Sequence, residues 1–241
     1  MLKPLKPKPL KPKPLKPKSL KPKSLKTKPL KPKPLKPNLL PVIIEPAFYQ
    51  RPDVLAVARE LLGAYVFTRL DGQLTGGRIV ETEAYRHVGD ASLALHLRRK
   101  AVQARGLYQP GGRAYLYTVY SRHTLFNLTA NTAAYPDTVL IRAIEPTEGL
   151  AFMLARRGLA AVARNLTAGP GLLTQALGLT PVLTDVPLQG PALWLEDRGQ
   201  PVPDAQVQAS ARVGLAYAGP EASQLPWRFR LIGSPWTSPA K

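Results

Sequence analysis

The sequence predicts an α+β fold, a single globular domain with a mixed, mostly antiparallel sheet and peripheral helices behind a disordered N-terminal tail. Two observations favour this class. Short runs rich in β-branched and aromatic residues are separated by Gly, Asp and Pro turns, which is typical of antiparallel strands. An alternating strand–helix–strand pattern and a glycine-rich phosphate fingerprint are both missing from the sequence, so a dinucleotide-binding fold is not expected.

The tail is predicted to cover residues 1–40 and the domain residues 41–241. In the tail a unit of Leu, Lys and Pro recurs every five residues, and its fourteen lysines, from Lys3 to Lys36, supply most of the formal net charge of +19. Prolines at this density exclude a helix interior, so the tail should be extended. Its charge favours a polyanion, either nucleic acid or an anionic membrane. A translated repeat upstream of the true start is the alternative.

The domain's elements follow from local signals. Asp53 can cap a helix over 54–62 that Gly63 ends. A strand at 64–70 turns at Asp71-Gly72 into a strand at 77–85, an antiparallel pair. The sequence 113–129 predicts a hairpin. The remaining predicted elements are helices at 148–157, after Thr147, and 172–177, after a Gly-Pro-Gly turn, and strands at 192–195, 211–215 and 228–232.

The strand at 77–85 carries two acids and a phenol. The period of two sends Glu81, Glu83 and Tyr85 to one face, while Val80 and Thr82 face the other way. Such an alternation is often a solvated sheet face, and that reading competes with a reactive pocket.

The hairpin at 113–129 is rich in tyrosine. Tyr115 and Tyr117 share one face, Tyr120 lies at the edge of a polar turn, and Asn127 lies on the returning strand. Tyrosines at alternate strand positions are commonly sheet packing, and Tyr115 fits that reading best.

Four motifs together resemble the alkyladenine DNA glycosylase family, the 3-methyladenine excision enzymes of the mammalian and Bacillus type. They occur in the family's order and span about Phe48 to Trp236. The resemblance implies a monofunctional glycosylase of base excision repair that flips alkylated or deaminated purines out of duplex DNA. Implied lesions are 3-methyladenine, 7-methylguanine, hypoxanthine and ethenoadenine. The motifs are Arg-Ile-Val-Glu-Thr-Glu-Ala-Tyr at 78–85, the hairpin with Tyr117, Tyr120 and Asn127, Leu-Ile-Arg-Ala-Ile-Glu-Pro-Thr-Glu-Gly at 140–149 and Gly-Ser-Pro-Trp at 233–236.

The resemblance also implies roles for single residues. Glu83 activates the water that attacks the sugar, and Tyr120, on a protruding hairpin that inserts into DNA, fills the space left by the flipped base. Tyr85 and Tyr117 sandwich the base. The implied base-binding pocket consists of Tyr85, His96, Tyr117, Asn127 and Arg142.

The pocket histidine is the main departure from the family pattern. Counting without gaps from Tyr85 places Ala94 where the family has a histidine, and His96 follows two residues later. In a strand, a shift of two residues keeps a side chain on the same face, so His96 can take the place of the family's histidine through a shifted loop. The alternative is that the histidine's contact with the base is absent. Gly171-Leu172 also replaces a polar pair, which leaves the preferred lesion open.

Composition limits the chemistry further. The chain has no cysteine and only three histidines, His87, His96 and His123, so neither a metal site nor a cofactor is predicted. The domain's two lysines, Lys100 and Lys241, lie in no motif, which favours water over an amine as the nucleophile. With no apolar run long enough to span a bilayer and no signal peptide, a cytoplasmic protein is expected. The expected form is a monomer acting on double-stranded DNA.

Two other functions compete. A non-catalytic module that binds damaged DNA or RNA would keep the tyrosine hairpin and the basic charge, but Glu83 opposes it. A carbohydrate hydrolase would use Glu81 and Glu83 as its carboxylate pair. These side chains are expected on one side of the substrate, whereas such enzymes flank the bond.

Overall fold

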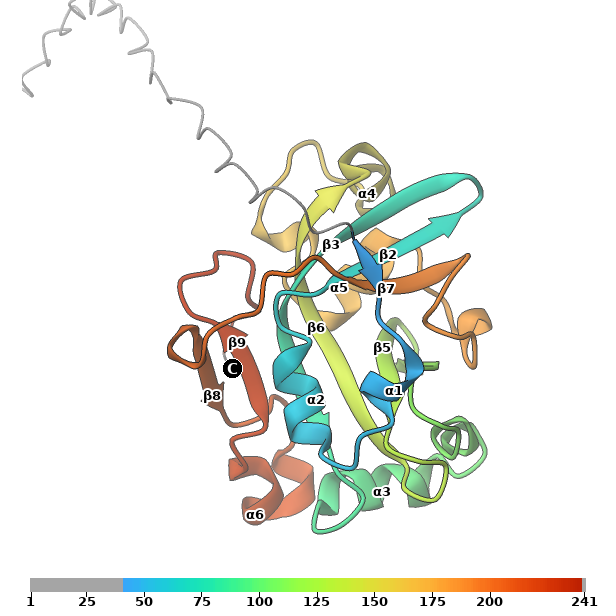
Figure 1. The fold of residues 1–241 in the computed structure, drawn as a ribbon, viewed down its shortest axis with the longest axis vertical. Helices are drawn as coiled ribbons and strands as arrows, with labels where there is room; N and C mark the ends of the chain where they lie inside the picture. Colours follow the sequence, from blue (N-terminus) through green and yellow to red (C-terminus); the bar gives the residue numbers. More distant parts are fainter. Residues whose placement is uncertain (1–40, 240–241) are drawn as a thin grey trace, which may run out of the picture. The chain divides into compact units, whose positions relative to one another are not determined.

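One antiparallel sheet organises the chain in the computed structural model, which describes residues 41–239 (Figure 1). Seven of its nine strands lie in the order β1-β7-β2-β3-β6-β5-β4, and β9, off this path, pairs with both β3 and β8. The α+β class with an antiparallel sheet and peripheral helices is therefore confirmed. The strands are β1 (Val42–Ile43), β2 (Tyr65–Leu70), β3 (Gln73–Tyr85), β4 (Ala114–Val119), β5 (His123–Ala130), β6 (Asp137–Glu148), β7 (Leu193–Asp197), β8 (Val207–Ser210) and β9 (Arg228–Leu231).

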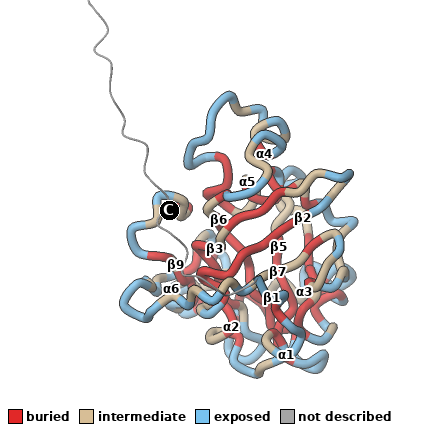
Figure 2. Tube along the Cα trace, turned by 45° about the horizontal axis from the view of Figure 1, so that its top comes forward, coloured by how far each residue is buried: buried red, intermediate tan, exposed pale blue. Residues whose placement is uncertain are grey.

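Strand β3 is the centre of this sheet. It pairs with β2 along its first half and with β6 along nearly its whole length, and β9 joins it at residues 81–83. Residues 79–84 are all buried, and Figure 2 shows buried backbone running through the central strands. This part of β3 is therefore held by strands along both of its edges, which fixes the position of its side chains.

The helices lie around the sheet. Helix α2 packs on the Thr82 side of β3, where the threonine hydroxyl donates to the Ala58 carbonyl at 2.7 Å. Asp53 caps this helix by accepting from the Leu55 and Ala56 amides, as predicted. The helices are α1 (Pro46–Tyr49), α2 (Val54–Glu60), α3 (Ala91–Arg99), α4 (Leu150–Arg157), α5 (Pro170–Leu177) and α6 (Gly219–Gln224).

Two predicted elements were wrong in place or type. Residues 211–215 form a loop rather than a strand, because Arg212 is buried in an ion pair and Gly214 has a φ of 76°. The strand lies just before it, in β8. Helix α4 begins at Leu150 and not at residue 148, because β6 continues to Glu148, which pairs with Gly76 of β3. Gly149, with a φ of 68°, makes the turn between them.

The tail predicted over residues 1–40 lies outside the described residues. Within residues 41–239, no helix has both the length and the apolar character needed to cross a membrane.

Candidate active site

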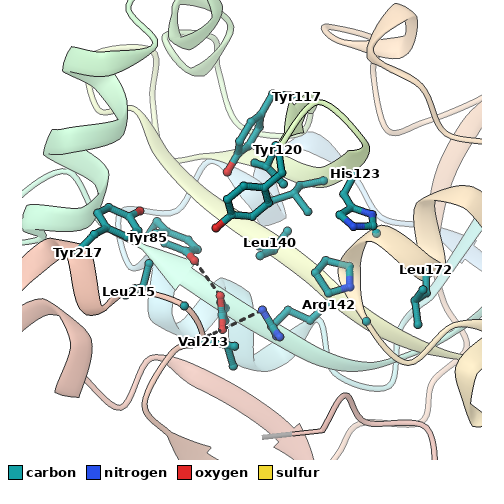
Figure 3. Close-up of a pocket in the computed structure, with 17 residues that line it drawn as sticks. Tyr85, Tyr117, Tyr120, His123, Leu140, Arg142, Leu172, Val213, Leu215 and Tyr217 are labelled. Carbon is teal, nitrogen blue, oxygen red and sulfur yellow. Dashed lines mark hydrogen bonds and ion pairs between the residues drawn. The ribbon is translucent and has the colours of Figure 1, made fainter. Parts of the chain in front are cut away.

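A cavity of about 440 Å³ opens where β3, β6 and the β4–β5 turn meet the 169–172 and 213–217 segments. Figure 3 shows the rings of Tyr85, Tyr117, Tyr120 and Tyr217 gathered on one side and Arg142 on the other. Five of the seven predicted site residues line this cavity. They are Glu83, Tyr85, Tyr117, Tyr120 and Arg142.

Glu83 is fully buried, and both of its carboxylate oxygens are held. Oε2 accepts from the Tyr85 hydroxyl at 2.8 Å, and Oε1 accepts from the Val213 amide at 2.8 Å. The Arg142 Nη1 lies 3.2 Å from Oε1. A buried carboxylate needs such donors, since burial without partners costs several kcal/mol. The reading of this strand as a solvated face was therefore wrong. The arrangement leaves a fixed negative charge at the wall of a cavity.

Glu81 lies on the same face of β3, but its two oxygens are held by another set of donors. Its Oε1 accepts from the Nε atoms of Arg142 and Arg228, each at 2.7 Å, and its Oε2 accepts from the Ser238 amide at 2.5 Å. Burial alone would raise the pKa of Glu81, but the two guanidinium groups hold it below its ordinary value. Glu81 does not line the cavity. Its charge instead balances Arg142, which bridges the two glutamates.

The two tyrosines of the predicted sandwich are neutral phenols. Burial raises the pKa of Tyr85 well above its ordinary value, and the neighbouring Glu83 raises it further. Burial raises the pKa of Tyr117 too. Tyr85 therefore keeps its proton, and its hydroxyl donates a hydrogen bond to Glu83 that orients the carboxylate.

The other two predicted residues, His96 and Asn127, line a smaller adjoining cavity of about 50 Å³. Tyr85 and Tyr117 border both spaces. Asn127 is buried and donates a long bond of 3.4 Å to the Tyr115 carbonyl. The structure thus places His96 and Asn127 beyond the two tyrosines, outside the cavity that Glu83 lines.

His96 reaches this place from a helix. The sequence argument assumed strand parity and was wrong on that point, because residues 91–99 form α3, where two residues rotate a side chain by about 200°. Ala94 is exposed, whereas His96 bonds the Tyr115 hydroxyl at 2.8 Å and packs 4.8 Å from the Tyr117 ring. Burial lowers the pKa of His96 to about 4, with a smaller contribution from Lys100, so the imidazole is neutral near pH 7.

Tyr120 stands apart from the buried residues. It lies in the turn between β4 and β5, closed by a bond of 3.2 Å from the Arg122 amide to the Val119 carbonyl. Its side chain is 88% exposed, and it and Ser121 have φ angles of 49° and 52°. Such left-handed conformations cost about 1–3 kcal/mol for a side chain other than glycine. The structure therefore holds the Tyr120 ring in solvent, although exposure of an apolar ring and a left-handed backbone each cost free energy.

Comparison with known proteins places these residues in a family. The methylpurine-DNA glycosylase family model matches residues 47–235. A relative from Gloeobacter violaceus is 42% identical over 185 residues, 76% of this chain and 81% of the relative. Relatives from Chlorobaculum tepidum (38% over 192 residues, 79% and 88%) and Bacillus licheniformis (37% over 191 residues, 79% and 94%) carry the same name, "Putative 3-methyladenine DNA glycosylase". The chain belongs to the methylpurine-DNA glycosylase family.

Membership makes the chain a DNA glycosylase, a hydrolase of N-glycosyl bonds that serves DNA repair. The family resemblance predicted from four short motifs is thereby confirmed. The matched region agrees with the span predicted from the motifs, about 48–236, and contains every predicted site residue.

The glycosylase cavity also contains residues that the sequence did not single out. Tyr217 borders both cavities, and the Val213 amide holds Glu83. Val213 lies within the segment 211–215 that was misread as a strand, and Tyr217 follows it, so their position gave no signal. The Gly-Pro-Gly segment at 169–171 lines the cavity. A Cβ on Gly171 would lie 2.9 Å from His123 Nδ1, which explains the glycine.

Proposed function

We propose that this glycosylase is monofunctional and removes alkylated or deaminated purines from duplex DNA with a water molecule that Glu83 activates. The expected lesions are 3-methyladenine, 7-methylguanine, hypoxanthine and ethenoadenine. The observation that carries the proposal is the fully buried Glu83 carboxylate at the wall of a cavity bordered by tyrosines. The domain that acts is residues 41–241, working as a monomer.

The chemistry follows from the fixed charge. A carboxylate beside the sugar can accept the proton of the attacking water and stabilise the positive charge that develops as the N-glycosidic bond breaks. Arg142 and the Val213 amide hold Oε1, so the group is oriented before substrate arrives. Arg142 divides its donors between the two glutamates, and Arg228 is a second cation at Glu81.

Water is favoured over an amine as the nucleophile. Lys100 is the one lysine in residues 41–239, and it follows α3 on the exposed surface, away from the walls of the Glu83 cavity. A Schiff base needs an amine at the sugar carbon. The enzyme should therefore leave an intact abasic strand.

Base flipping explains the rest of the geometry. A glycosylase must take its target out of the stack, because the reacting bond is inaccessible inside a duplex. Tyr85 and Tyr117 border both cavities and would stack on the extruded purine, whose far edge would reach His96 and Asn127 in the smaller cavity. Tyr120, exposed on the β4–β5 turn, is suited to fill the vacated space.

The test is single-turnover release of free base from duplexes carrying hypoxanthine, ethenoadenine or 3-methyladenine, against an undamaged duplex. Glu83→Gln should abolish release and keep most of the duplex affinity, because an amide fills the site but cannot act as a base. Glu145→Gln, on β6 and outside the cavity, is the matched control and should be near wild type. A Glu83→Gln rate near wild type would refute the assignment.

Family membership, which makes the chain a hydrolase of N-glycosyl bonds, opposes the alternative of a non-catalytic damaged-DNA or RNA binding module. It would bind lesion duplexes and release no base from any of them. The same assay separates the two, since binding is measured alongside release.

A further inference from the structure

Arg212 is a buried cation directly behind one wall of the proposed base pocket. Its Cζ lies 4.5 Å from the centre of the Tyr85 ring and 5.1 Å from that of Trp227. The side chain is fully buried and does not line the cavity. Tyr85 therefore has a cation on its protein side and the cavity on its open side.

The hydrogen bonds of Arg212 exclude a direct contact with DNA. Nη1 donates to the Ala84 carbonyl at 2.9 Å and to Asp90 Oδ2 at 2.6 Å. Nη2 donates to Asp90 Oδ1 at 2.9 Å and to the Ala222 carbonyl at 3.2 Å. Four donors are thus used inside the protein, and what Arg212 offers the pocket is its charge and its packing.

Asp90 neutralises this charge only in part at the position of Tyr85. The carboxylate lies on the guanidinium edge and also accepts from the Ser92 amide and hydroxyl at the start of α3, whereas the guanidinium carbon lies against the ring. A base stacked on the open side of Tyr85 would lie about 8 Å from the Arg212 charge, adding a stacking distance of about 3.5 Å to the 4.5 Å observed. At that distance two buried charges interact appreciably.

The lesions differ in charge. 7-Methylguanine and 3-methyladenine carry a formal positive charge in the nucleotide, whereas hypoxanthine and ethenoadenine are neutral. A cation is attracted to the face of a tyrosine ring, but a second cation behind that ring opposes the attraction. A neutral purine gains the stacking without this opposition.

We propose that Arg212 is a specificity-determining positioning residue, whose charge behind Tyr85 shifts the pocket away from positively charged alkylpurines and toward neutral lesions. The inference rests on the proposed function, because it requires the base to stack on Tyr85. Its partner Asp90 sets how strong the effect is.

The test compares single-turnover base release from two duplexes, one with 7-methylguanine and one with hypoxanthine. The double variant Arg212→Met/Asp90→Asn removes both charges and leaves the net charge of the protein unchanged. It should raise the ratio of 7-methylguanine to hypoxanthine release about fivefold. Asp90→Asn alone leaves the Arg212 charge unbalanced, so this ratio should fall below wild type.

The release ratio is expected to rise in the double variant and to fall in Asp90→Asn, and these opposite changes distinguish an effect of charge from a loss of structure. If Arg212 only supports the loop that carries Val213, both variants should lower both rates together, and the ratio would stay constant; that result would overturn the inference. Either variant alone decides the question if the other fails to fold, as judged by its thermal unfolding. Arg198→Met, which removes a cation over Tyr65 at 4.2 Å far from the cavity, is the control and should leave the ratio unchanged. A wild-type protein that releases neither base would refute the proposed function instead.

Discussion

The Glu83 region and the Tyr120 turn are built by opposite physical rules. Glu83 is fully buried, and a phenol, an amide and a guanidinium group hold it. Tyr120 is 88% exposed with a left-handed backbone, on a turn closed by one backbone bond. The first region is fixed before substrate arrives; the second holds an aromatic ring where only a partner can bury it. Substitutions in the two regions should therefore separate chemistry from DNA binding.

The largest effect is expected at Arg142, which serves both buried glutamates. Arg142→Met leaves Glu81 with Arg228 alone and removes the guanidinium from Glu83. Base release should be lost, and the free energy of unfolding should fall by about 3–5 kcal/mol, because a buried charge loses its partner. Urea unfolding measures the second quantity.

The control for this variant is Arg198→Met, which breaks the ion pair with Glu196. Because Arg198 is 29% exposed, the loss should stay within about 1 kcal/mol. Equal losses of unfolding free energy in the two variants would show that the Arg142 network stabilises the fold no more than the Arg198–Glu196 pair does.

Tyr120 should give the opposite pattern. Tyr120→Ala removes the ring and should weaken lesion binding and flipping by about 1–3 kcal/mol, by analogy with base stacking, while stability stays near wild type. Tyr120→Gly should lose the same binding and also gain stability, because glycine adopts a positive φ without strain. Fluorescence of a reporter base measures extrusion. Unchanged extrusion in both variants would remove Tyr120 from its proposed role.

Much of this contrast could be read from the sequence, because it depends on short-range patterns. The period of two placed Glu81, Glu83 and Tyr85 on one face, and the structure joins Glu83 to Tyr85 directly. The turn at Tyr120 follows from a polar segment between a tyrosine-rich strand and the returning strand. Spacing could not predict which glutamate lines the cavity and which is held away from it, because the second arrangement depends on Arg228 and Ser238, far along the chain.

The 211–215 loop shows why local pattern failed. Apolar residues alternate there as in a strand, but Arg212 is drawn inward by Asp90 and two carbonyls, and the Val213 amide bonds a carboxylate instead of a neighbouring strand. These tertiary contacts outweigh β propensity. His96 was misplaced for another reason: Asp90 caps α3, and Arg98 and Arg99 lie in its last turn, which are signals of a helix that the assumption of a strand passed over.

His96 should affect selectivity more than overall rate. It lies beyond Tyr117 and bonds Tyr115, so a purine edge that reaches the smaller cavity would contact it. His96→Ala should slow the release of some lesions, because the lost hydrogen bond raises the activation free energy by about 1–3 kcal/mol. Rates on several lesion duplexes test this. An unaltered lesion profile would identify His96 as a packing residue.

The same side chain predicts a pH dependence of stability. The folded pKa of about 4 lies below the ordinary 6.5, so the unfolded chain takes up the proton first as pH falls. The stability that neutral His96 contributes is present above about pH 6.5 and is lost between 6.5 and 4. Allowing for partial exposure, the loss should be about 1–2 kcal/mol. In His96→Ala the fall in unfolding free energy over this range should be smaller by that amount; identical curves would contradict the pKa shift.

The smallest effect on base release is expected from residues 1–40, which precede every predicted site residue in the sequence. We propose that its fourteen lysines bind duplex phosphates without regard to sequence. Deleting it should leave single-turnover release intact, because Glu83, Arg142 and Tyr120 all lie in the remaining chain. Binding to undamaged DNA should weaken, and each lost phosphate contact should reduce the slope of log K against log salt by about 0.9. The control is a full-length variant with these lysines changed to glutamine, which keeps the length and should reproduce the shallower slope. An unchanged slope in the truncated protein would show that the segment is not a DNA anchor, and slower single-turnover release would show that it contributes to the pocket itself.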